Sequence, residues 1–171
     1  GSDVFLSKYS ANGTQEWTQL IGNGMTQMPG GLAIEENGYI YLTGATQGSL
    51  TGQAHSGEFD AFLHKYSAEG NLEWSTLLGT SLDEYSTSVT VSNDGSVYIG
   101  GFNHSNNENQ GLIKYGLEPI TLDGQELTGI SNAFVTKYSS DGNKEWTRTL
   151  GTEGETICNG LTTGNDGSIY V

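Results

Sequence analysis

Short runs of alternating hydrophobic and polar residues, separated by turns that contain glycine, extend along the whole chain. The first run, residues 3–10, places Phe5 and Tyr9 on one face of a strand and Val4 and Leu6 on the other. Both faces therefore carry large side chains, which is typical of a sheet that is covered on both sides. Three further strands are predicted in the first copy of the pattern, at residues 15–21, 31–35 and 39–43.

The pattern occurs three times, because the segment 3–10 recurs as residues 60–67 and 132–139. Asn-Gly, Asp-Gly and Glu-Gly pairs follow at matching places and supply the glycine that a tight hairpin needs at positive φ. We interpret the recurring aromatic and lysine positions as structural. They are Phe5, Lys8, Tyr9, Trp17, Phe62, Lys65, Tyr66, Trp74, Phe134, Lys137, Tyr138 and Trp146.

Three four-stranded units in one chain predict an all-β fold, a β-propeller arc of about three antiparallel blades that forms part of a larger propeller. The predicted boundaries are 1–44 for blade repeat 1, 45–59 for a linker loop, 60–101 for blade repeat 2, 102–131 for a long inter-blade loop with an insert, and 132–171 for blade repeat 3, truncated in its last strand. A closed propeller usually has about four to eight blades. The remaining blades are therefore expected from the same longer chain or from a homo-oligomer.

The recurring tryptophans and lysines allow two interpretations each. A buried indole would pack between blades, whereas three exposed indoles could line a sugar-binding surface. Each recurring lysine is followed, on the next strand, by a glutamate just before the tryptophan. The lysine is expected either to pair with that carboxylate or to lie over the indole, and both roles are structural.

Taken together, the pattern Asp-Ala-Phe-(Leu/Val)-x-Lys-Tyr-Ser-x-x-Gly-x-x-x-Trp, then Leu-Gly, then (Asp/Asn)-Gly-x-(Val/Ile)-Tyr-(Val/Ile), resembles the bacterial β-propeller repeat family known as SBBP repeats. The resemblance implies a propeller blade in an exported or cell-surface bacterial protein, and it implies no particular ligand. Quinoprotein dehydrogenase propellers share the Gly-x-x-x-Trp ending. Their repeat has Ala, Asp and Thr where this chain has Ser7, Tyr9 and Asn12, so a quinoprotein-like enzyme is the less favoured alternative.

Charge narrows the classes of partner. Six Lys plus Arg against twenty Asp plus Glu give a formal net charge of −14, which disfavours nucleic acid and anionic membranes. No apolar run approaches the roughly 20 residues of a membrane helix, so membrane insertion is not expected. The acidity suits an extracellular or cell-surface protein whose signal lies outside this segment. It also favours capture of Ca²⁺ by carboxylates.

Candidate binding residues lie in the links between the copies. The long link is dense in hydrogen-bonding groups, and its candidates for ligand binding are His104, Asn106, Asn107, Glu108 and Asn109. The alternative is a solvated loop that contacts nothing. Acidic residues after the second strand of two copies are candidate calcium ligands, namely Asp83, Glu84, Glu153 and Glu155. The first copy has none there, so at most a single calcium site is expected, and no other cofactor.

No catalytic pattern is evident. The histidines are His55, His64 and His104, without a Ser-His-Asp or paired-carboxylate arrangement. His64 replaces a serine and a threonine of the other copies, which we interpret as an ordinary substitution. The single cysteine, Cys158, is interpreted as a small half-buried side chain. The sequence thus predicts a non-catalytic propeller acting in binding, adhesion or assembly with a protein or glycan on a cell surface. The alternative is a purely structural spacer in a large extracellular protein.

Overall fold

The computed structural model of the chain describes residues 1–22, 24–50, 52–105, 120–128, 130–152 and 154–171, and its regular structure is built of β-strands. The first strands are β1 (Val4–Tyr9), β2 (Gln15–Ile21), β3 (Gln27–Ile34), β4 (Ile40–Thr46), β5 (Asp60–Tyr66) and β6 (Leu72–Leu78). They are followed by β7 (Asp83–Val91), β8 (Val97–His104), β9 (Thr121–Leu122), β10 (Gln125–Glu126), β11 (Ser131–Tyr138), β12 (Lys144–Gly151), β13 (Thr162–Thr163) and β14 (Ile169–Tyr170). Within the described ranges, no helix has the length and apolar character that crossing a membrane requires.

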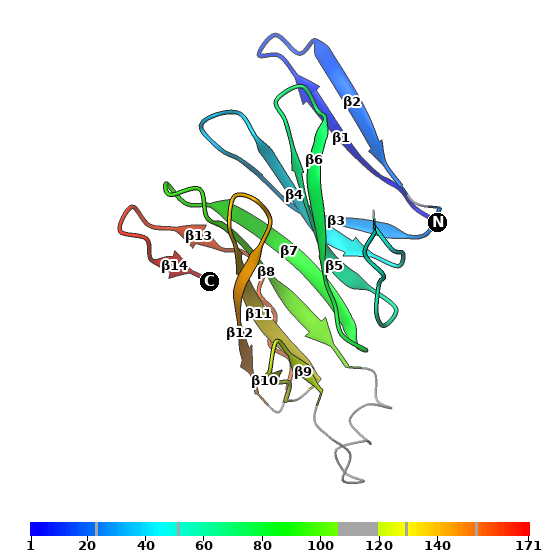
Figure 1. Cartoon of the computed structure of the whole chain (residues 1–171), viewed down its shortest axis with the longest axis vertical. Coiled ribbons are helices and arrows are strands. Elements are labelled where there is room, and N and C mark those ends of the chain that lie inside the picture. The colour runs from blue at the N-terminus through cyan, green and yellow to red at the C-terminus, as the bar shows by residue number, and fades with distance from the viewer. Residues whose placement is uncertain (23, 51, 106–119, 129, 153) are drawn as a thin grey trace.

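Two four-stranded antiparallel sheets form the centre of the molecule (Figure 1). The first has the order β3-β4-β5-β6 and the second the order β12-β11-β8-β7. Two-stranded sheets of β1 with β2 and of β13 with β14 lie on either side, and β9 pairs with β10 in a small hairpin. The predicted all-β class is confirmed, and the four-stranded antiparallel sheets are consistent with β-propeller repeats.

The sheets cross the boundaries that the sequence repeats predicted. The copy at 1–44 contributes β1 and β2 to one sheet and β3 and β4 to the next, where β4 pairs with β5 of the following copy. The same pairing joins β8 to β11. The strands on either side of the predicted linker loop, and those on either side of the predicted long loop, therefore pair with each other within one sheet. The sheets and the sequence repeats differ because hydrogen bonding between antiparallel strands determines where a sheet begins. The first residue of a repeated motif does not.

One end of the sheets carries only short hairpin turns, and we call it the turn end. Each of its six turns closes with a glycine whose N–H donates to the carbonyl three residues earlier, at 2.8–3.0 Å. These glycines all have φ between 80° and 91°, where a side chain would be strained. They are Gly13, Gly38, Gly70, Gly95, Gly142 and Gly167. The positive φ that the sequence predicted is thus observed in every copy.

Strand connections at the opposite end differ in length and sequence from copy to copy, and we call this end the loop end (Figure 1). Residues 22–26 join β2 to β3, residues 47–59 join β4 to β5, and residues 79–82 join β6 to β7. Binding residues in sheet proteins commonly lie on variable loops held by a rigid scaffold. The loop end is therefore the first place to look for a site.

Hydrophobic side chains pack together in two joints between neighbouring sheets. The first joint packs β1 and β2 against β4 and β5, with Leu6 of the hairpin and Phe62 of β5 both buried. The second joint packs the two four-stranded sheets against each other, with Leu63 on one side and Phe134 on the other. Phe5 occupies the matching position on β1, and 68 % of its surface is exposed.

Recurring tryptophans and lysines stabilise the turn end. The indole N–H of Trp17 donates to the carbonyl of Ala68 at 3.2 Å, and that of Trp74 donates to Ser140 at 3.2 Å. Each of these indoles lies against the glycine of the neighbouring hairpin turn. Lys8 pairs with Glu16, and Lys137 with Glu145, both at 2.8 Å. Lys65 instead donates to the Ser140 carbonyl at 3.0 Å and lies over the ring of Tyr39, with its Nζ 4.2 Å from the ring centroid.

Candidate functional site

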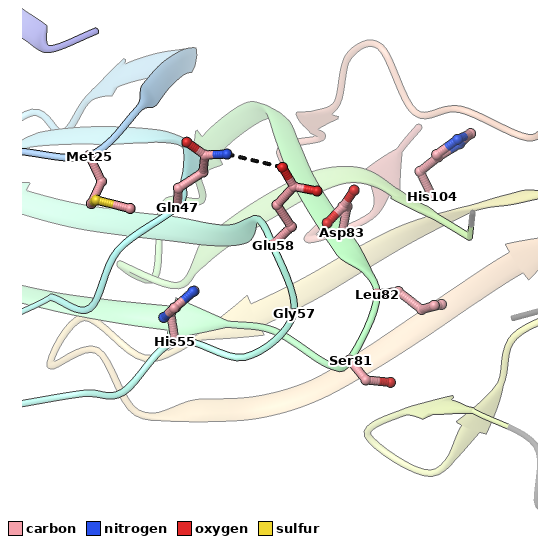
Figure 2. A pocket seen from close by; sticks show the side chains of 9 residues that line it. All are labelled: Met25, Gln47, His55, Gly57, Glu58, Ser81, Leu82, Asp83 and His104. Carbon is pink, nitrogen blue, oxygen red and sulfur yellow. Dashed lines mark hydrogen bonds between the residues drawn. The ribbon is translucent and has the colours of Figure 1, made fainter. Parts of the chain in front are cut away.

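An open pocket of about 320 Å³ lies at the loop end (Figure 2). Three connections, together with the first residue of β7 and the last of β8, contribute its lining. The lining residues are Met25, Gln47, His55, Gly57, Glu58, Ser81, Leu82, Asp83 and His104. Six of these nine residues carry polar side chains, so the pocket can exchange several hydrogen bonds with a ligand.

Close contact between two loops shapes the pocket. Gly57 has a φ of 69°, and a Cβ atom on it would lie 2.2 Å from the carbonyl oxygen of Leu82. Only glycine permits this approach of residues 55–59 to residues 79–82. The backbone N–H of Phe59 then donates to the Asp83 carboxylate at 3.1 Å, and the N–H of Glu84 donates to the carbonyl of Phe59 at 2.8 Å. The two walls are thus joined directly.

Two buried carboxyl groups form hydrogen bonds to the two loops that line the pocket. Asp60 accepts from the N–H of Ser56 at 2.9 Å, which fixes the loop next to His55. Glu84 is fully buried and accepts from the N–H and the hydroxyl of Thr80 at 2.7 and 2.6 Å. The pKa of the Glu84 carboxyl is raised to about 8, mainly by burial and also by the nearby charges of Asp60 and Asp83, while the hydrogen bonds from Thr80 oppose the rise. Burial also raises the pKa of Asp60.

Aromatic rings extend from the pocket wall along the sheet. Phe59 lies against Tyr85 with ring centroids 5.3 Å apart, and Tyr85 stacks on Phe102 at 5.2 Å. Burial raises the pKa of the Tyr85 phenol to about 12, and the carboxylates of Asp83 and Glu58 contribute to that rise. Both carboxylates of the pocket therefore lie near this aromatic row.

Two of the predicted site residues come together in the pocket. His104, a ligand-binding candidate, and Asp83, a calcium candidate, are direct partners across β7 and β8. The Nδ1 atom of His104 lies 3.0 Å from the hydroxyl of Ser131, which fixes the orientation of the ring. The other predicted ligand-binding residues, Asn106, Asn107, Glu108 and Asn109, lie outside the described residues.

The remaining calcium candidates lie in different surroundings. Glu84 is directed into the interior, where it accepts a hydrogen bond from Thr80. Glu155 is exposed, and its backbone forms an isolated parallel β-bridge with Ser131. Glu153 lies outside the described residues. Among the residues that the structure describes, no group of three or more His, Cys, Asp or Glu is arranged to hold a metal ion. Calcium binding by these residues stays a prediction.

Sequence reasoning missed the contribution of the first link. Gln47 and Glu58 line the pocket and are hydrogen-bonded to each other at 3.2 Å, as Figure 2 shows. They lie in residues 45–59, which the sequence presented as a linker. The available signal was its concentration of polar side chains, including His55, at a place where the copies differ.

The polar groups of the pocket are suited to hydrogen bonding with a ligand. Among the described residues of the pocket, no hydrogen bond joins either histidine to a carboxylate, and the hydroxyl of Ser131 is the partner of His104. Carboxylate, amide and imidazole groups at the mouth of an open pocket can bond to hydroxyl or amino groups. Anionic ligands are disfavoured by Glu58 and Asp83 and by the net charge of −14.

Comparison with known proteins supports the repeat assignment. Residues 16–51 match the family model described as SBBP, Beta-propeller repeat. This segment runs from β2 through β4 and into the loop after β4, so the match agrees with the repeat recognised in the sequence.

Two curated relatives are each 28 % identical to this chain. One is the regulatory protein FlaEY of Caulobacter vibrioides, aligned over 99 % of this chain and 19 % of its own length. The other is an uncharacterized WD repeat-containing protein, L264, of Acanthamoeba polyphaga mimivirus, aligned over 68 % of this chain and 8 % of its own length. The chain therefore spans less than a fifth of either relative, and neither description names a catalytic activity.

A solved structure of a protein of unknown function from Bacteroides caccae also matches, with a TM-score of 0.35 and 8 % identity. The match covers 99 % of this chain and 64 % of that one.

Proposed function

We propose that this chain, which carries an SBBP β-propeller repeat, is a non-catalytic binding module of a secreted or cell-surface protein, and that its loop end binds a glycan. One observation carries the proposal. Three connections that differ between the copies, together with the adjoining ends of β7 and β8, contribute two histidines, two carboxylates and an amide to one open pocket of about 320 Å³. Such a set bonds to the hydroxyl groups of a sugar without requiring any reaction.

The pocket also limits the kind of glycan. Because Glu58 and Asp83 are both acidic, the expected ligand is a neutral sugar or one that carries an amino group. Sialylated or uronic acid-containing glycans would bring a third negative charge next to these two carboxylates. Adhesion to a cell surface follows as the biological role that such binding would support.

A second candidate function is a structural spacer, favoured by the outer faces of the molecule. Phe5 and Leu150 have 68 % and 67 % of their surface exposed, whereas Phe62 and Leu78 are buried at the matching positions between sheets. Apolar side chains at these positions are suited to further sheets of the same kind. These would come from the same longer chain or from a homo-oligomer. A spacer of this kind would have no saturable ligand.

A glycan array tests the proposal. The wild-type protein is expected to bind a small set of neutral or amino-containing glycans in a saturable way. Asp83→Asn and Glu58→Gln remove the two charges of the pocket with little change in shape. Each is expected to weaken binding of an amino-containing glycan by about tenfold, because a hydrogen bond to a charged group contributes about 1.5–3 kcal/mol.

Glu69→Gln provides the matched control, because Glu69 is exposed at the turn end. It removes one charge far along the strands from the pocket and is expected to leave binding unchanged. Equal binding of sialylated and neutral glycans, or equal losses in Glu69→Gln and Glu58→Gln, would contradict the proposed site. A blank array with correctly folded protein would favour the spacer.

A further inference from the structure

A second cavity, of about 250 Å³, lies in the joint between the β1–β2 hairpin and the first four-stranded sheet. Its lining comes from β2, from the start of β3, from the loop after β4, and from β5, β6 and the turn between them. The lining residues are Gln19, Leu20, Ile21, Gly22, Gln27, Leu50, His64, Tyr66, Gly70 and Leu72. The cavity shares no lining residue with the loop-end pocket, and it contains no Asp, Glu, Lys or Arg.

Two buried polar side chains in this cavity have no partner. Gln27 and His64 are each only 3 % exposed. Neither the two polar atoms of the Gln27 amide nor the two ring nitrogens of His64 form a hydrogen bond. Buried polar groups are normally satisfied, so four unpaired atoms lining one cavity indicate that something else bonds to them.

The other copies show that the fold can satisfy both positions internally. Ser7 and Thr136, which match His64, bond to the hydroxyls of Thr18 and Thr147 at 2.6 and 3.0 Å. Glu84, which matches Gln27, bonds twice to Thr80. Among the described residues of the three copies, only this joint combines an imidazole and an amide that both lack hydrogen-bond partners. The chain therefore carries a feature here that packing alone does not require.

We propose that this cavity binds a small, neutral, polyhydroxylated molecule of the size of a monosaccharide or smaller. A hydroxyl group both donates and accepts, as do an imidazole and a carboxamide, so the three groups can satisfy one another. The side chains of Ile21 and Leu50 offer apolar contact to the carbon skeleton. The volume corresponds to about eight water molecules at roughly 30 Å³ each, and it is smaller than the pockets of about 300–1,000 Å³ that take drug-sized ligands.

Charge selects against ionic ligands at this site. Burial lowers the pKa of His64 to about 4, so the ring is neutral at physiological pH. The neighbouring Tyr66 ring, whose centroid lies 5.9 Å from the His64 centroid, adds to its apolar surroundings. A carboxylate or ammonium group would lie beside the buried, neutral Gln27 and His64 without a counter-charge.

The test uses the histidine ring signals in two-dimensional NMR, with the intact chain and with glucose and glycerol as neutral probes. Glucuronate is the charged counterpart of glucose. Glucose or glycerol is expected to shift the ring signals of His64 in a saturable way and to leave His55 and His104 unchanged. Glucuronate is expected to bind at least about tenfold more weakly than glucose. His64 signals that stay constant up to the solubility limit of both neutral probes would overturn the proposal and assign the cavity to water.

A variant that restores the pairing of the third copy provides the second readout. His64→Thr combined with Ser75→Thr places two hydroxyls where Thr136 and Thr147 pair, and it removes the imidazole. Binding, followed through the methyl signals of Leu50, is expected to fall at least about tenfold, with the fold checked by circular dichroism. If the double variant does not fold, Gln27→Thr, which introduces the residue of the third copy, replaces it. His55→Gln is the control at the loop end, and unchanged binding in the His64 or Gln27 variant would contradict the site.

Discussion

The most quantitative prediction concerns the buried carboxyl group of Glu84. Its pKa rises from 4.5 to about 8 because the side chain is fully buried. The folded state therefore binds a proton more tightly than the unfolded state does. The stabilisation is complete below pH 4.5 and is lost as the pH rises through about 8. Each pKa unit corresponds to about 1.4 kcal/mol, so the loss is at most on the order of 4–5 kcal/mol.

Glu84→Gln removes this ionisation and keeps the shape of the side chain. The first copy has glutamine at the matching position, Gln27, where it is also buried. The amide oxygen can still accept from the N–H of Thr80, so the variant is expected to match the wild type at pH 5 within about 1 kcal/mol. At pH 9 it is expected to be more stable by several kcal/mol.

Urea unfolding at pH 5, 7 and 9 measures this difference directly, as the change in unfolding free energy between the two proteins. Glu36→Gln, at an exposed residue of a turn, controls for the general effect of removing one charge from an acidic chain. Unfolding free energies of Glu84→Gln and wild type that run parallel from pH 5 to pH 9 would refute the reasoning, because they would mean that Glu84 is ionised in the folded protein.

Three further predictions follow from burial and backbone geometry. Phe62→Ala should lower the free energy of unfolding, measured with urea, by about 3–5 kcal/mol. Phe5→Ala, at the matching exposed position, should lower it by less than about 1 kcal/mol. Equal losses in the two variants would contradict the packing of the first joint. Gly95→Ala places a side chain at a φ of 80° and should cost about 1 kcal/mol. Gly70→Ala should lower the free energy of unfolding by more than Gly95→Ala does, because the new Cβ would lie 3.0 Å from the Trp17 ring. A smaller loss of melting temperature in Gly70→Ala than in Gly95→Ala would contradict that contact. Cys158 is 3 % exposed, and burial raises the pKa of its thiol. Ellman's reagent should therefore react with this thiol only after the protein unfolds. Rapid reaction with the folded protein would contradict the burial of Cys158.

Local chemistry explains which features the sequence predicted well. Each Asn-Gly, Asp-Gly or Glu-Gly pair specifies its own turn through the positive φ of glycine, so all six turns could be placed without tertiary information. The recurring residues of the first strand likewise indicated a sheet covered on both faces, as Phe62 and Leu63 show by their burial on opposite faces of β5. These are properties of a few adjacent residues.

Pairing between distant strands explains what the sequence did not predict. The repeated motif begins at the third strand of a sheet, and only the pairing of β4 with β5 shows this. Asp83 and Glu84 are adjacent in sequence, and both were predicted as candidate calcium ligands. In a strand their side chains point to opposite faces, and so Asp83 lines the pocket while Glu84 is buried. The sequence did not indicate the surroundings of His64, because they include residues of β2, which lies far from His64 along the chain.

Both candidate sites depend on the pairing of β4 with β5. It positions residues 47–59 at the loop end beside Asp83, and it aligns His64 with the sheet that carries Gln27. Cross-strand NOEs in the intact chain test this pairing most directly. We expect a ladder of NOEs between β4 and β5 that includes Gly44 with Phe62, and a second ladder between β8 and β11 that includes Ile99 with Thr136. A ladder between β2 and β3, with none between β4 and β5, would contradict this pairing.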